Sequence, residues 1–331
     1  MSSNRIPVVL VGLGRMGSNH LRVIKENPSF DLKAVVDVKL PDNFATMNPG
    51  IAGYASLEDL DAADVAYGAV VIAAPTGSHY EIARHFIARD KHLLVEKPLA
   101  STLEQCRVLI EESKNRNLIL GVGHVERFNP AVRKLHEVIQ NGWLDKPIHF
   151  SVTRVGGYPQ TILPGNNVML DLAVHDVDVL QSLIGPLTVV SSIVHNTVRS
   201  DIPDTAEILL KNGEGVSASI HVNWITPTKI RTIRVTGTRG VCFVDYILQT
   251  CTLMGGNLLS HQPTLRTDFQ NLIRQYQNTD KIEFGIQNEE PLKAQLRAFH
   301  KALTGDPSEL CSGEAGASAV EVSLRALSYM A

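Results

Sequence analysis

The sequence predicts an α/β protein of two domains: a doubly wound parallel sheet, then an α+β domain with a large, mostly antiparallel open sheet. Three observations lead to this prediction. An apolar run at residues 6–11 enters a glycine-rich turn and then a helix-forming stretch. Apolar strand-like runs and amphipathic stretches alternate to about residue 122. Beyond that point β-rich runs dominate, so we expect domains at 1–122 and 123–331.

The composition is that of an ordinary globular protein and favours small-molecule partners. Of the 331 residues, 44% are hydrophobic and 20% are charged. A formal net charge of −3 without runs of Lys or Arg argues against nucleic-acid and membrane partners. The chain shows no leader and no membrane-spanning stretch, so we expect a cytoplasmic protein. Four scattered cysteines and the lack of an H-E-x-x-H motif predict no metal site.

The turn after the first strand reads G-L-G-R-M-G from residue 12 to residue 17. Gly12 would allow the sharp turn, and Gly14 would let the backbone approach a pyrophosphate. Gly17 would let the next helix, at 15–26, pack closely on the strand. The N-terminus of that helix would attract phosphate charge. This turn therefore predicts a bound dinucleotide.

A second strand, at 32–36, ends in Asp37, which lies 20 residues after Gly17. This is the expected distance for the carboxylate that binds the adenosine ribose hydroxyls. Because a carboxylate repels a 2′-phosphate, Asp37 predicts NAD rather than NADP as the cofactor. Lys39 lies close enough in sequence to soften that repulsion.

The rest of the first domain continues the alternation. Ser56 opens a short capped helix. The purely apolar strand at 68–74 suits a parallel sheet covered on both faces, and it ends at P-T-G-S-H, on the edge where such sheets bind ligands. The next strand ends at Glu96-Lys97. The remaining helices and strands are expected at 79–89, 92–95, 102–116 and 118–122.

The second domain has a different pattern. Strands are expected at 148–155, 187–198, 206–210, 216–224, 229–236 and 241–246, and helices at 130–141, 168–184, 290–303 and 313–330. The run 216–224 alternates apolar and polar residues, so one face of the sheet should be buried. An uncovered opposite face would need another subunit, which predicts a homodimer or homotetramer. The long polar segment 255–280 could close over a nucleotide or lie in a subunit interface.

Four stretches together resemble the Gfo/Idh/MocA family of NAD(P)-dependent sugar and inositol oxidoreductases. They are the glycine turn at 12–17, E-K-P at 96–98, G-H-V-E-R-F-N-P at 123–130 and D-L-A-V-H-D at 171–176. The resemblance covers essentially the whole chain and implies an N-terminal Rossmann domain that binds NAD. It also implies that Lys97, Asp171 and His175 are catalytic and that the bond before Pro98 is cis.

The resemblance further implies a set of cofactor contacts. They are Leu13, Gly14, Arg15 and Met16 at the pyrophosphate, Asp37 at the ribose, Ala74, Pro75, Thr76 and His79 near the middle of the dinucleotide, and Glu96 and Lys97 at the nicotinamide ribose. For His79, a plain structural position at the start of a helix is an equally good interpretation.

The residue types at the catalytic positions suit the oxidation of an alcohol. Asp171 and His175 are four residues apart, which on an α-helix places them on one face, where the carboxylate can orient the imidazole. Histidine titrates near neutral pH and can take the hydroxyl proton as hydride leaves. The Lys97 ammonium would stabilise the developing alkoxide. Family members differ over whether the lysine or the histidine takes the proton.

The finer resemblance is to the UDP-N-acetylglucosamine 3-dehydrogenases of this family. These oxidise the sugar 3-hydroxyl to a ketone that an aminotransferase converts to a 3-amino sugar, which can feed lipid A. Arg127 and Arg154 offer planar donor forks for the substrate pyrophosphate, and the alternative for Arg127 is an ion pair with Glu126 or with a neighbouring helix. Asn129 and Tyr158 could bind sugar groups, whereas Trp224 is more readily explained as a core residue than as a stacking surface.

Two alternatives stay open. One is a dehydrogenase of a free polyol such as inositol, whose site has less need of arginines for a pyrophosphate. The other is a dinucleotide-binding regulator without turnover, which the fold does not exclude. The presence of Lys97, Asp171 and His175 argues against the regulator, because a sensor needs no base beside the nicotinamide.

Overall fold

A computed structural model of the chain describes residues 5–159, 162, 166–255 and 280–329. The chain forms two compact units. The first combines Met1–Val125 with Glu290–Glu321, and the second is formed mainly by Glu126–Ile162 and Asn166–Glu289. The first boundary lies between Val125 and Glu126 instead of at 122/123. The segment Glu290–Glu321, which the sequence places in the second domain, returns to the first unit.

That returning segment contains helix α9 (Pro291–Thr304). The buried side chains of α9 join the core cluster that also contains residues of the first two strands and the first helix. Phe299 of α9 stacks on Phe30, with ring centroids 6.1 Å apart. The amphipathic pattern of α9 is visible in the sequence, but the sequence does not show which sheet this helix covers.

The first unit is built on a six-stranded sheet in the order β3-β2-β1-β4-β5-β6, and the strand pairs are all parallel. The bounds are β1 Ile6–Val11, β2 Phe30–Val36, β3 Ala52–Tyr54, β4 Ala69–Ile72, β5 His92–Glu96 and β6 Leu120–Gly123. The order reverses between β1 and β4, and open α/β sheets bind ligands outside the carboxyl ends of the strands at such a reversal. The predicted doubly wound sheet is confirmed.

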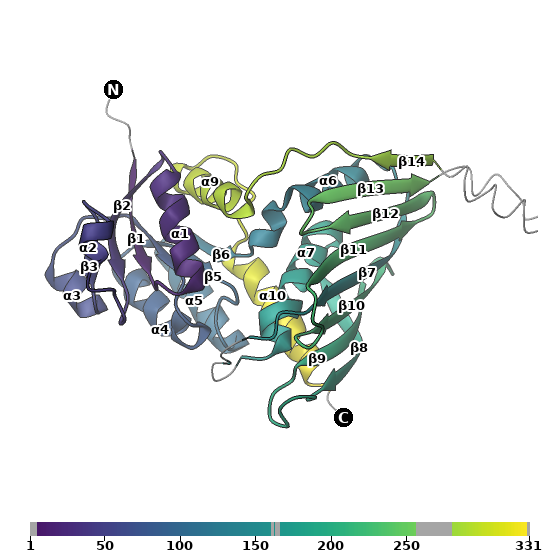
Figure 1. The fold of residues 1–331 in the computed structure, drawn as a ribbon, viewed down its shortest axis with the longest axis horizontal. Helices are drawn as coiled ribbons and strands as arrows, with labels where there is room; N and C mark the ends of the chain where they lie inside the picture. Colours follow the sequence, from purple (N-terminus) through teal and green to yellow (C-terminus); the bar gives the residue numbers. More distant parts are fainter. Residues whose placement is uncertain (1–4, 160–161, 163–165, 256–279, 330–331) are drawn as a thin grey trace, which may run out of the picture. The chain divides into compact units, whose positions relative to one another are not determined.

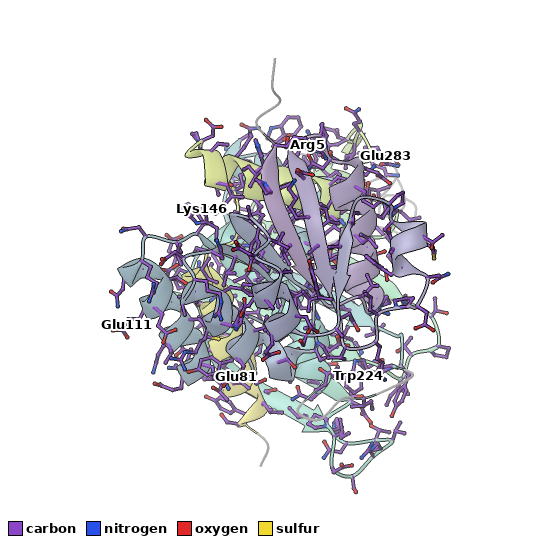
Figure 2. All side chains as sticks on the ribbon, turned by 90° about the vertical axis from the view of Figure 1, so that its left-hand side faces the viewer. Arg5, Glu81, Glu111, Lys146, Trp224 and Glu283 are labelled. Atoms are coloured by element: carbon purple, nitrogen blue, oxygen red, sulfur yellow. The ribbon has the colours of Figure 1, made fainter. Side chains whose placement is uncertain are left out.

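Among the helices of the first unit, α3 and α5 have side-chain caps, from Ser56 and Thr102, and α4 follows Pro75. The bounds are α1 Arg15–Glu26, α2 Phe44–Met47, α3 Leu57–Ala62, α4 Thr76–Ile87 and α5 Leu103–Asn115. Helix α10 (Gly313–Leu327) belongs to this unit up to Glu321 and to the second unit from Val322. Ser56 caps α3 through the Asp59 amide, as predicted. Helix α4 begins three residues earlier than expected, directly after Pro75. Figure 2 shows Glu81 and Glu111 on the exposed faces of α4 and α5.

The second unit is built on an eight-stranded sheet in the order β14-β13-β12-β11-β7-β10-β9-β8. Among the described strands of this sheet, only β7 and β10 pair in parallel, which confirms the mostly antiparallel sheet. The bounds are β7 Pro147–Val155, β8 Leu187–His195, β9 Thr205–Asn212, β10 Ser217–Asn223, β11 Ile230–Gly237, β12 Gly240–Asp245, β13 Thr250–Gly255 and β14 Asp280–Glu283. The sequence did not predict β13 and β14.

The two faces of this sheet differ. Figure 1 shows helices α6 (Pro130–Gln140) and α7 (Val174–Ile184) on the same side of it. In β10, Ala218, Ile220 and Val222 are buried while Ser217, Ser219 and His221 are partly exposed, as the alternation predicts. Large apolar side chains remain exposed elsewhere on the sheet, including Ile193 at 59% and Phe243 at 40%.

Among the helices that the structure describes, none combines the length and apolar character needed to cross a membrane. The segment 255–280, for which we expect a closing or interface role, lies almost entirely outside the described residues.

Candidate active site

The glycine turn of the first unit has the geometry that its spacing predicts. Gly12 has φ +93°, and a Cβ there would lie 2.7 Å from the backbone of Ala73. A Cβ on Gly17 would lie 2.0 Å from the Gly12 carbonyl oxygen. Neither position therefore accepts a larger residue. At Gly14, by contrast, an added Cβ would meet no described atom within 4 Å.

Gly14 is also the N-cap of α1, and no side chain of the described residues caps this helix. The first turn, from Arg15 to Ser18, carries no acidic residue. The amide groups at this helix start therefore face open space with a favourable dipole for an anion. This arrangement fits the pyrophosphate of a dinucleotide.

Asp37 is bound to the same turn. Its Oδ2 accepts a hydrogen bond from the Leu13 amide at 2.5 Å, and its Oδ1 accepts one from the Lys39 amide at 2.7 Å. The side chain remains half-exposed, and that of Lys39 is exposed. The two backbone bonds hold the carboxylate at the carboxyl end of β2, next to the turn, where the sequence predicts a ribose contact.

The end of β5 presents Glu96 and Lys97 in different environments. Glu96 is 7% exposed, and its Oε1 lies 2.7 Å from Nε2 of His20, a fully buried residue of α1. Burial opposes ionisation of Glu96, but the hydrogen bond from His20 and nearby positive charge outweigh it, so its pKa is lowered. A Cβ on Gly123 would lie 2.9 Å from the Glu96 carboxylate, which explains the glycine there.

This burial changes the interpretation of Glu96. Its carboxylate binds His20 in the interior, which favours a structural role for Glu96 over the expected contact with the nicotinamide ribose. The Lys97–Pro98 peptide bond is cis, as the family resemblance implies. His20 was not identified from the sequence, although it lies three residues after Gly17, on the inner face of the same helix.

His79 is likewise an interior residue, with only 1% of its surface exposed. Its two ring nitrogens lie 2.9 Å from the Pro98 carbonyl oxygen and 2.8 Å from that of Ala74. Of the two interpretations of His79, a structural position at the start of the helix is favoured over a cofactor contact, because both ring nitrogens face backbone oxygens. Ala74 and Thr76 are half-buried and Pro75 is exposed, so these remain at the surface of the sheet edge.

In the second unit, Asp171 and His175 lie across a change of helix type. A π-helical turn, Met169–Ala173, contains Asp171, and α7 begins at Val174. The regular α-helix assumed from the sequence is thus wrong over this stretch, and π-turns of this kind are common at functional sites. Asp171 and His175 are both half-buried among fully buried neighbours, so both reach the surface of this element.

Trp224 binds the side chain of Asp171. Its indole Nε1 donates a hydrogen bond to Asp171 Oδ2 at 3.0 Å, and its side chain is completely buried. Tyr158 packs edge-on against the indole, with centroids 6.1 Å apart, and remains 42% exposed. Trp224 is therefore a core residue, and Tyr158 is the predicted sugar-binding residue that remains accessible.

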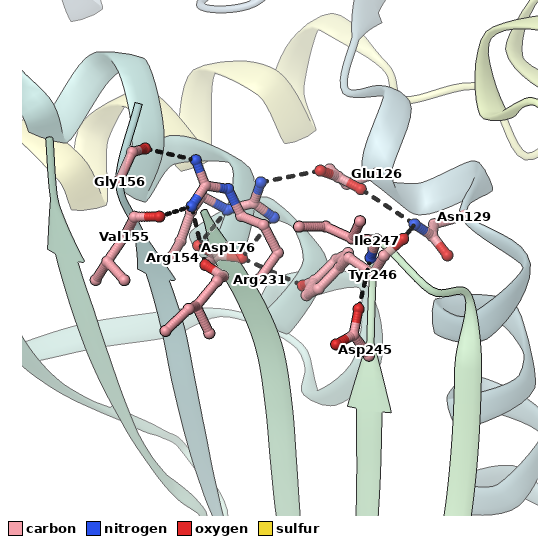
Figure 3. A network of polar contacts seen from close by, with 11 residues as sticks. Glu126, Asn129, Arg154, Val155, Gly156, Asp176, Arg231, Asp245, Tyr246 and Ile247 are labelled. Carbon is pink, nitrogen blue, oxygen red and sulfur yellow. Dashed lines mark hydrogen bonds and ion pairs between the residues drawn. The ribbon is translucent and has the colours of Figure 1, made fainter. Parts of the chain in front are cut away.

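Arg154 lies inside a network of charged side chains (Figure 3). Its Nε and Nη2 donate to the Asp176 carboxylate at 2.7 and 3.0 Å, and its Nη1 donates to Glu126 at 2.9 Å. The Tyr246 ring lies 4.9 Å from the guanidinium carbon, and the Tyr246 hydroxyl donates to Asp176 at 3.2 Å. Arg231 completes the network by donating to the carbonyls of Val155 and Gly156.

Burial sets the charges of this network. It disfavours the Arg154 cation, but Asp176 and Glu126 more than compensate, so the pKa of Arg154 lies well above its usual value. Burial raises the pKa of Asp176, partly offset by Arg154, and it raises that of Tyr246 strongly. Every guanidinium nitrogen of Arg154 already donates to a carboxylate. These hydrogen bonds favour a structural role for Arg154 within the second unit over the predicted contact with a substrate phosphate.

Arg127 and Asn129 are also bound to protein groups. Arg127 makes a bidentate pair with the buried Asp178, with both N···O distances 2.7 Å, and its side chain is 19% exposed. Asn129 is 3% exposed, caps α6 through the Ala131 amide and donates to the Tyr246 carbonyl. For Arg127 this is the alternative of an ion pair with a neighbouring helix, because Asp178 lies in α7. The Tyr246 partner of Asn129 lies 117 residues away in the chain, so sequence spacing does not reveal it.

The predicted site residues are thus divided between the two units. The first unit brings the glycine turn, Asp37, the segment after β4 and Lys97 to the carboxyl ends of neighbouring strands. In the second unit, Trp224 contacts both Asp171 and Tyr158, and His175 lies in the first turn of α7. Arg127, Asn129 and Arg154 bind other groups of the protein.

Known proteins share this architecture. Residues 6–124 match the oxidoreductase family with an NAD-binding Rossmann fold, and residues 132–242 match the GFO/IDH/MocA C-terminal domain. Inositol 2-dehydrogenase 2 of Saccharopolyspora erythraea is 30% identical over 64% of this chain and 65% of that enzyme, just under two thirds of its length. UDP-N-acetylglucosamine 3-dehydrogenase of Acidithiobacillus ferrooxidans is 24% identical over 75% of this chain and 74% of that enzyme.

A solved structure shows the same fold. UDP-N-acetylglucosamine 3-dehydrogenase GnnA from Acidithiobacillus ferrooxidans has a TM-score of 0.82 and 21% identity, with 98% of both chains covered. Further inositol dehydrogenases match in sequence as well. The match to the NAD-binding fold confirms NAD as the cofactor.

Proposed function

The chain belongs to the Gfo/Idh/MocA family of oxidoreductases, as its motifs predict, and on this premise we propose that it oxidises the 3-hydroxyl of UDP-N-acetylglucosamine with NAD. The observation that supports dehydrogenation most is the presence of Lys97 directly after β5, of Asp171 on the π-turn and of His175 on α7. The relative with this activity, matched over about three quarters of both chains, supports the nucleotide sugar.

In the proposed reaction the glycine turn and Asp37 would hold NAD, which would supply the hydride acceptor for the substrate carbon. His175 takes the hydroxyl proton, and Asp171, held by Trp224, orients the imidazole. The Lys97 ammonium stabilises the negative charge that develops on the oxygen. The products are the 3-oxo nucleotide sugar, NADH and a proton. An aminotransferase that converts the ketone to a 3-amino sugar, for lipid A or another surface glycan, is the proposed functional partner.

One observation favours a second candidate, the oxidation of a free polyol such as inositol. The two arginines that the sequence reserves for a pyrophosphate are bound to Asp178 and to Asp176 with Glu126. A substrate without phosphate does not need to displace those carboxylates. The inositol 2-dehydrogenase relative is consistent with this candidate.

The decisive experiment follows NADH absorbance after mixing the protein with NAD and either UDP-N-acetylglucosamine, N-acetylglucosamine or myo-inositol. A glutamate-dependent sugar aminotransferase is added in a parallel reaction, because alcohol oxidation by NAD is uphill and needs removal of the ketone. Signal with the UDP-sugar alone supports the proposal. Signal with myo-inositol alone moves the assignment to the polyol, and bound NAD without any signal favours the regulator.

We propose a homo-oligomer as the state of the protein. Ile193 and Phe243 are large apolar side chains exposed on the eight-stranded sheet, and a second copy would remove them from water. Light scattering with Ile193→Lys and Phe243→Lys tests this, with Val38→Lys, at an exposed apolar residue of the first unit, as the control. A monomeric wild type would contradict it.

A further inference from the structure

In the second unit, the segment that leaves β7 lies against the segment that enters β11. Gly156 and Gly157 directly follow β7, with φ +83° and +93°. A Cβ on Gly156 would lie 2.4 Å from the Thr228 carbonyl oxygen, so the two segments touch through their backbones. The Arg231 guanidinium of β11 joins them further, because it donates to the carbonyl oxygens of Val155 and Gly156 (Figure 3). This end of the sheet is therefore closely packed.

Lys229, which directly precedes β11, lies over the second of these glycines. A Cβ on Gly157 would lie 3.0 Å from Cε and 3.8 Å from Nζ of Lys229. A side chain at residue 157 would thus crowd the lysine, whereas glycine leaves room for its aliphatic stem. Lys229 itself is exposed. A positive charge therefore lies at the surface beside the exit of β7.

Contacts within the second unit connect this lysine with Asp171. Tyr158 follows Gly157 in the chain, and its ring packs against Trp224. Trp224 in turn donates its indole hydrogen bond to Asp171. Tyr158 and Lys229 are both exposed, so a substrate held at Asp171 can extend across the tyrosine to the ammonium group.

The charges around Arg231 support the same proximity. Burial is the main cause that lowers the pKa of Arg231, and the Asp171 carboxylate is among the groups that raise it. Arg231 follows Lys229 by two residues, so both side chains leave β11 and its entry on the same side. The start of β11 therefore lies within electrostatic reach of the proposed catalytic aspartate.

The basic side chains of this region differ in what they bind. Arg127 and Arg154 donate to carboxylates, and Arg231 donates to backbone carbonyls. Within the described part of the chain, no hydrogen bond or ion pair involves the Lys229 ammonium group. A phosphate group would have to displace protein partners from the arginines, whereas at Lys229 it would displace only water. Lys229 is therefore the cation most readily available to an anionic substrate.

We propose that Lys229 binds the pyrophosphate of a nucleoside diphosphate sugar, on the same accessible surface as Tyr158. The choice of a nucleotide sugar rests on the proposed function, because a free polyol has no anionic group for the lysine to bind. Lys229 then takes the role that the sequence assigns to Arg127 and Arg154. A lysine suits it as a compact point charge on a flexible stem.

The first test measures binding without turnover. UDP is titrated calorimetrically into the full-length protein, with NAD at saturation so that UDP does not enter the dinucleotide site. Lys229→Gln should raise the Kd for UDP roughly tenfold, the scale of one charge-assisted hydrogen bond at an exposed position. Lys229→Arg keeps the charge and should restore most of the affinity. Lys146→Gln, at an exposed lysine directly before β7, is the matched control and should bind UDP like the wild type.

The second test separates binding from chemistry. In Lys229→Gln the KM for UDP-N-acetylglucosamine should rise roughly tenfold while kcat stays within about twofold, since a contact remote from the reacting carbon acts equally on ground state and transition state. The KM for NAD should stay at the wild-type value. Steady-state rates of NADH formation, with the aminotransferase present, measure these constants.

A wild type that binds no UDP, or equal UDP affinities of the wild type and Lys229→Gln, would overturn the assignment of Lys229. A fall in kcat at unchanged KM would overturn it as well. UDP binding that depends on Lys229, in a wild type that oxidises no UDP-N-acetylglucosamine, would contradict the proposed function alone.

Discussion

The two units build their parts of the site by different means. In the first unit, main-chain groups shape the site. The glycine turn leaves the N-terminus of α1 without a side-chain cap, and the amides of Leu13 and Lys39 donate hydrogen bonds to Asp37. In the second, buried side chains hold one another, as Arg154 does with Asp176 and Glu126. Main-chain devices depend on local spacing, whereas side-chain networks depend on residues that only folding brings together.

The largest expected effect concerns the network of the second unit. Arg154→Met leaves Asp176 and Glu126 in the interior without their counter-charge, so the free energy of unfolding should fall by about 3–5 kcal/mol. Urea denaturation measures the change. Arg199→Met, which removes an exposed partner of Asp201, serves as the control and should leave the midpoint unchanged.

Normal stability of Arg154→Met combined with a raised KM for UDP-N-acetylglucosamine would contradict this interpretation. Arg154 would then be a substrate-binding residue, as its position in the sequence suggests.

The next effect concerns the proposed base. His175→Ala should lower kcat by ~100-fold or more, the usual contribution of a general base, and leave the Kd for NAD within severalfold. His195→Ala, at an exposed end of β8, is the matched control. If His175→Ala turned over substrate at nearly the normal rate, the proton would have to pass to another group, with Lys97 the first candidate.

Substitutions in the glycine turn separate its role in folding from its role in NAD binding. Gly17→Ala should lower the free energy of unfolding by about 1–3 kcal/mol, since its Cβ would overlap the Gly12 carbonyl oxygen. Gly14→Ala should fold normally and weaken NAD binding by roughly tenfold, because its methyl group would occupy the approach of the pyrophosphate. Thermal unfolding and NAD titration measure the two effects. Unchanged NAD affinity in Gly14→Ala would place the pyrophosphate elsewhere.

The smallest effect is expected for cofactor choice. Asp37→Asn removes the charge that repels a 2′-phosphate while keeping a side chain of the same size, so the ratio of NAD to NADP affinity should fall severalfold. Parallel titrations with the two cofactors measure this ratio, and Asp31→Asn, also in β2, is the control. Equal affinity of the wild type for NAD and NADP would refute the proposed role of Asp37.

The site could be predicted from the sequence wherever its parts are close in the chain. Gly12, Gly14, Gly17 and Asp37 belong to one strand-turn-helix-strand unit, and their spacing is dictated by the geometry of that unit. Arg127, Asn129 and Arg154 were assigned to the substrate because their side chains suit a sugar nucleotide. Chemical suitability says nothing about distant competitors such as Asp178, which lies 51 residues from Arg127.

By itself, the sequence determined the two fold classes, the family and the cofactor, because strand and helix periodicities and the glycine spacing are local properties of the chain. Only the tertiary structure decided that α9 completes the core of the first unit and that a π-turn carries Asp171. It also decided that His79 faces two carbonyls and that Arg154 faces two carboxylates. Buried polar groups take the partners that the fold brings to them, and those partners follow no spacing rule in the sequence.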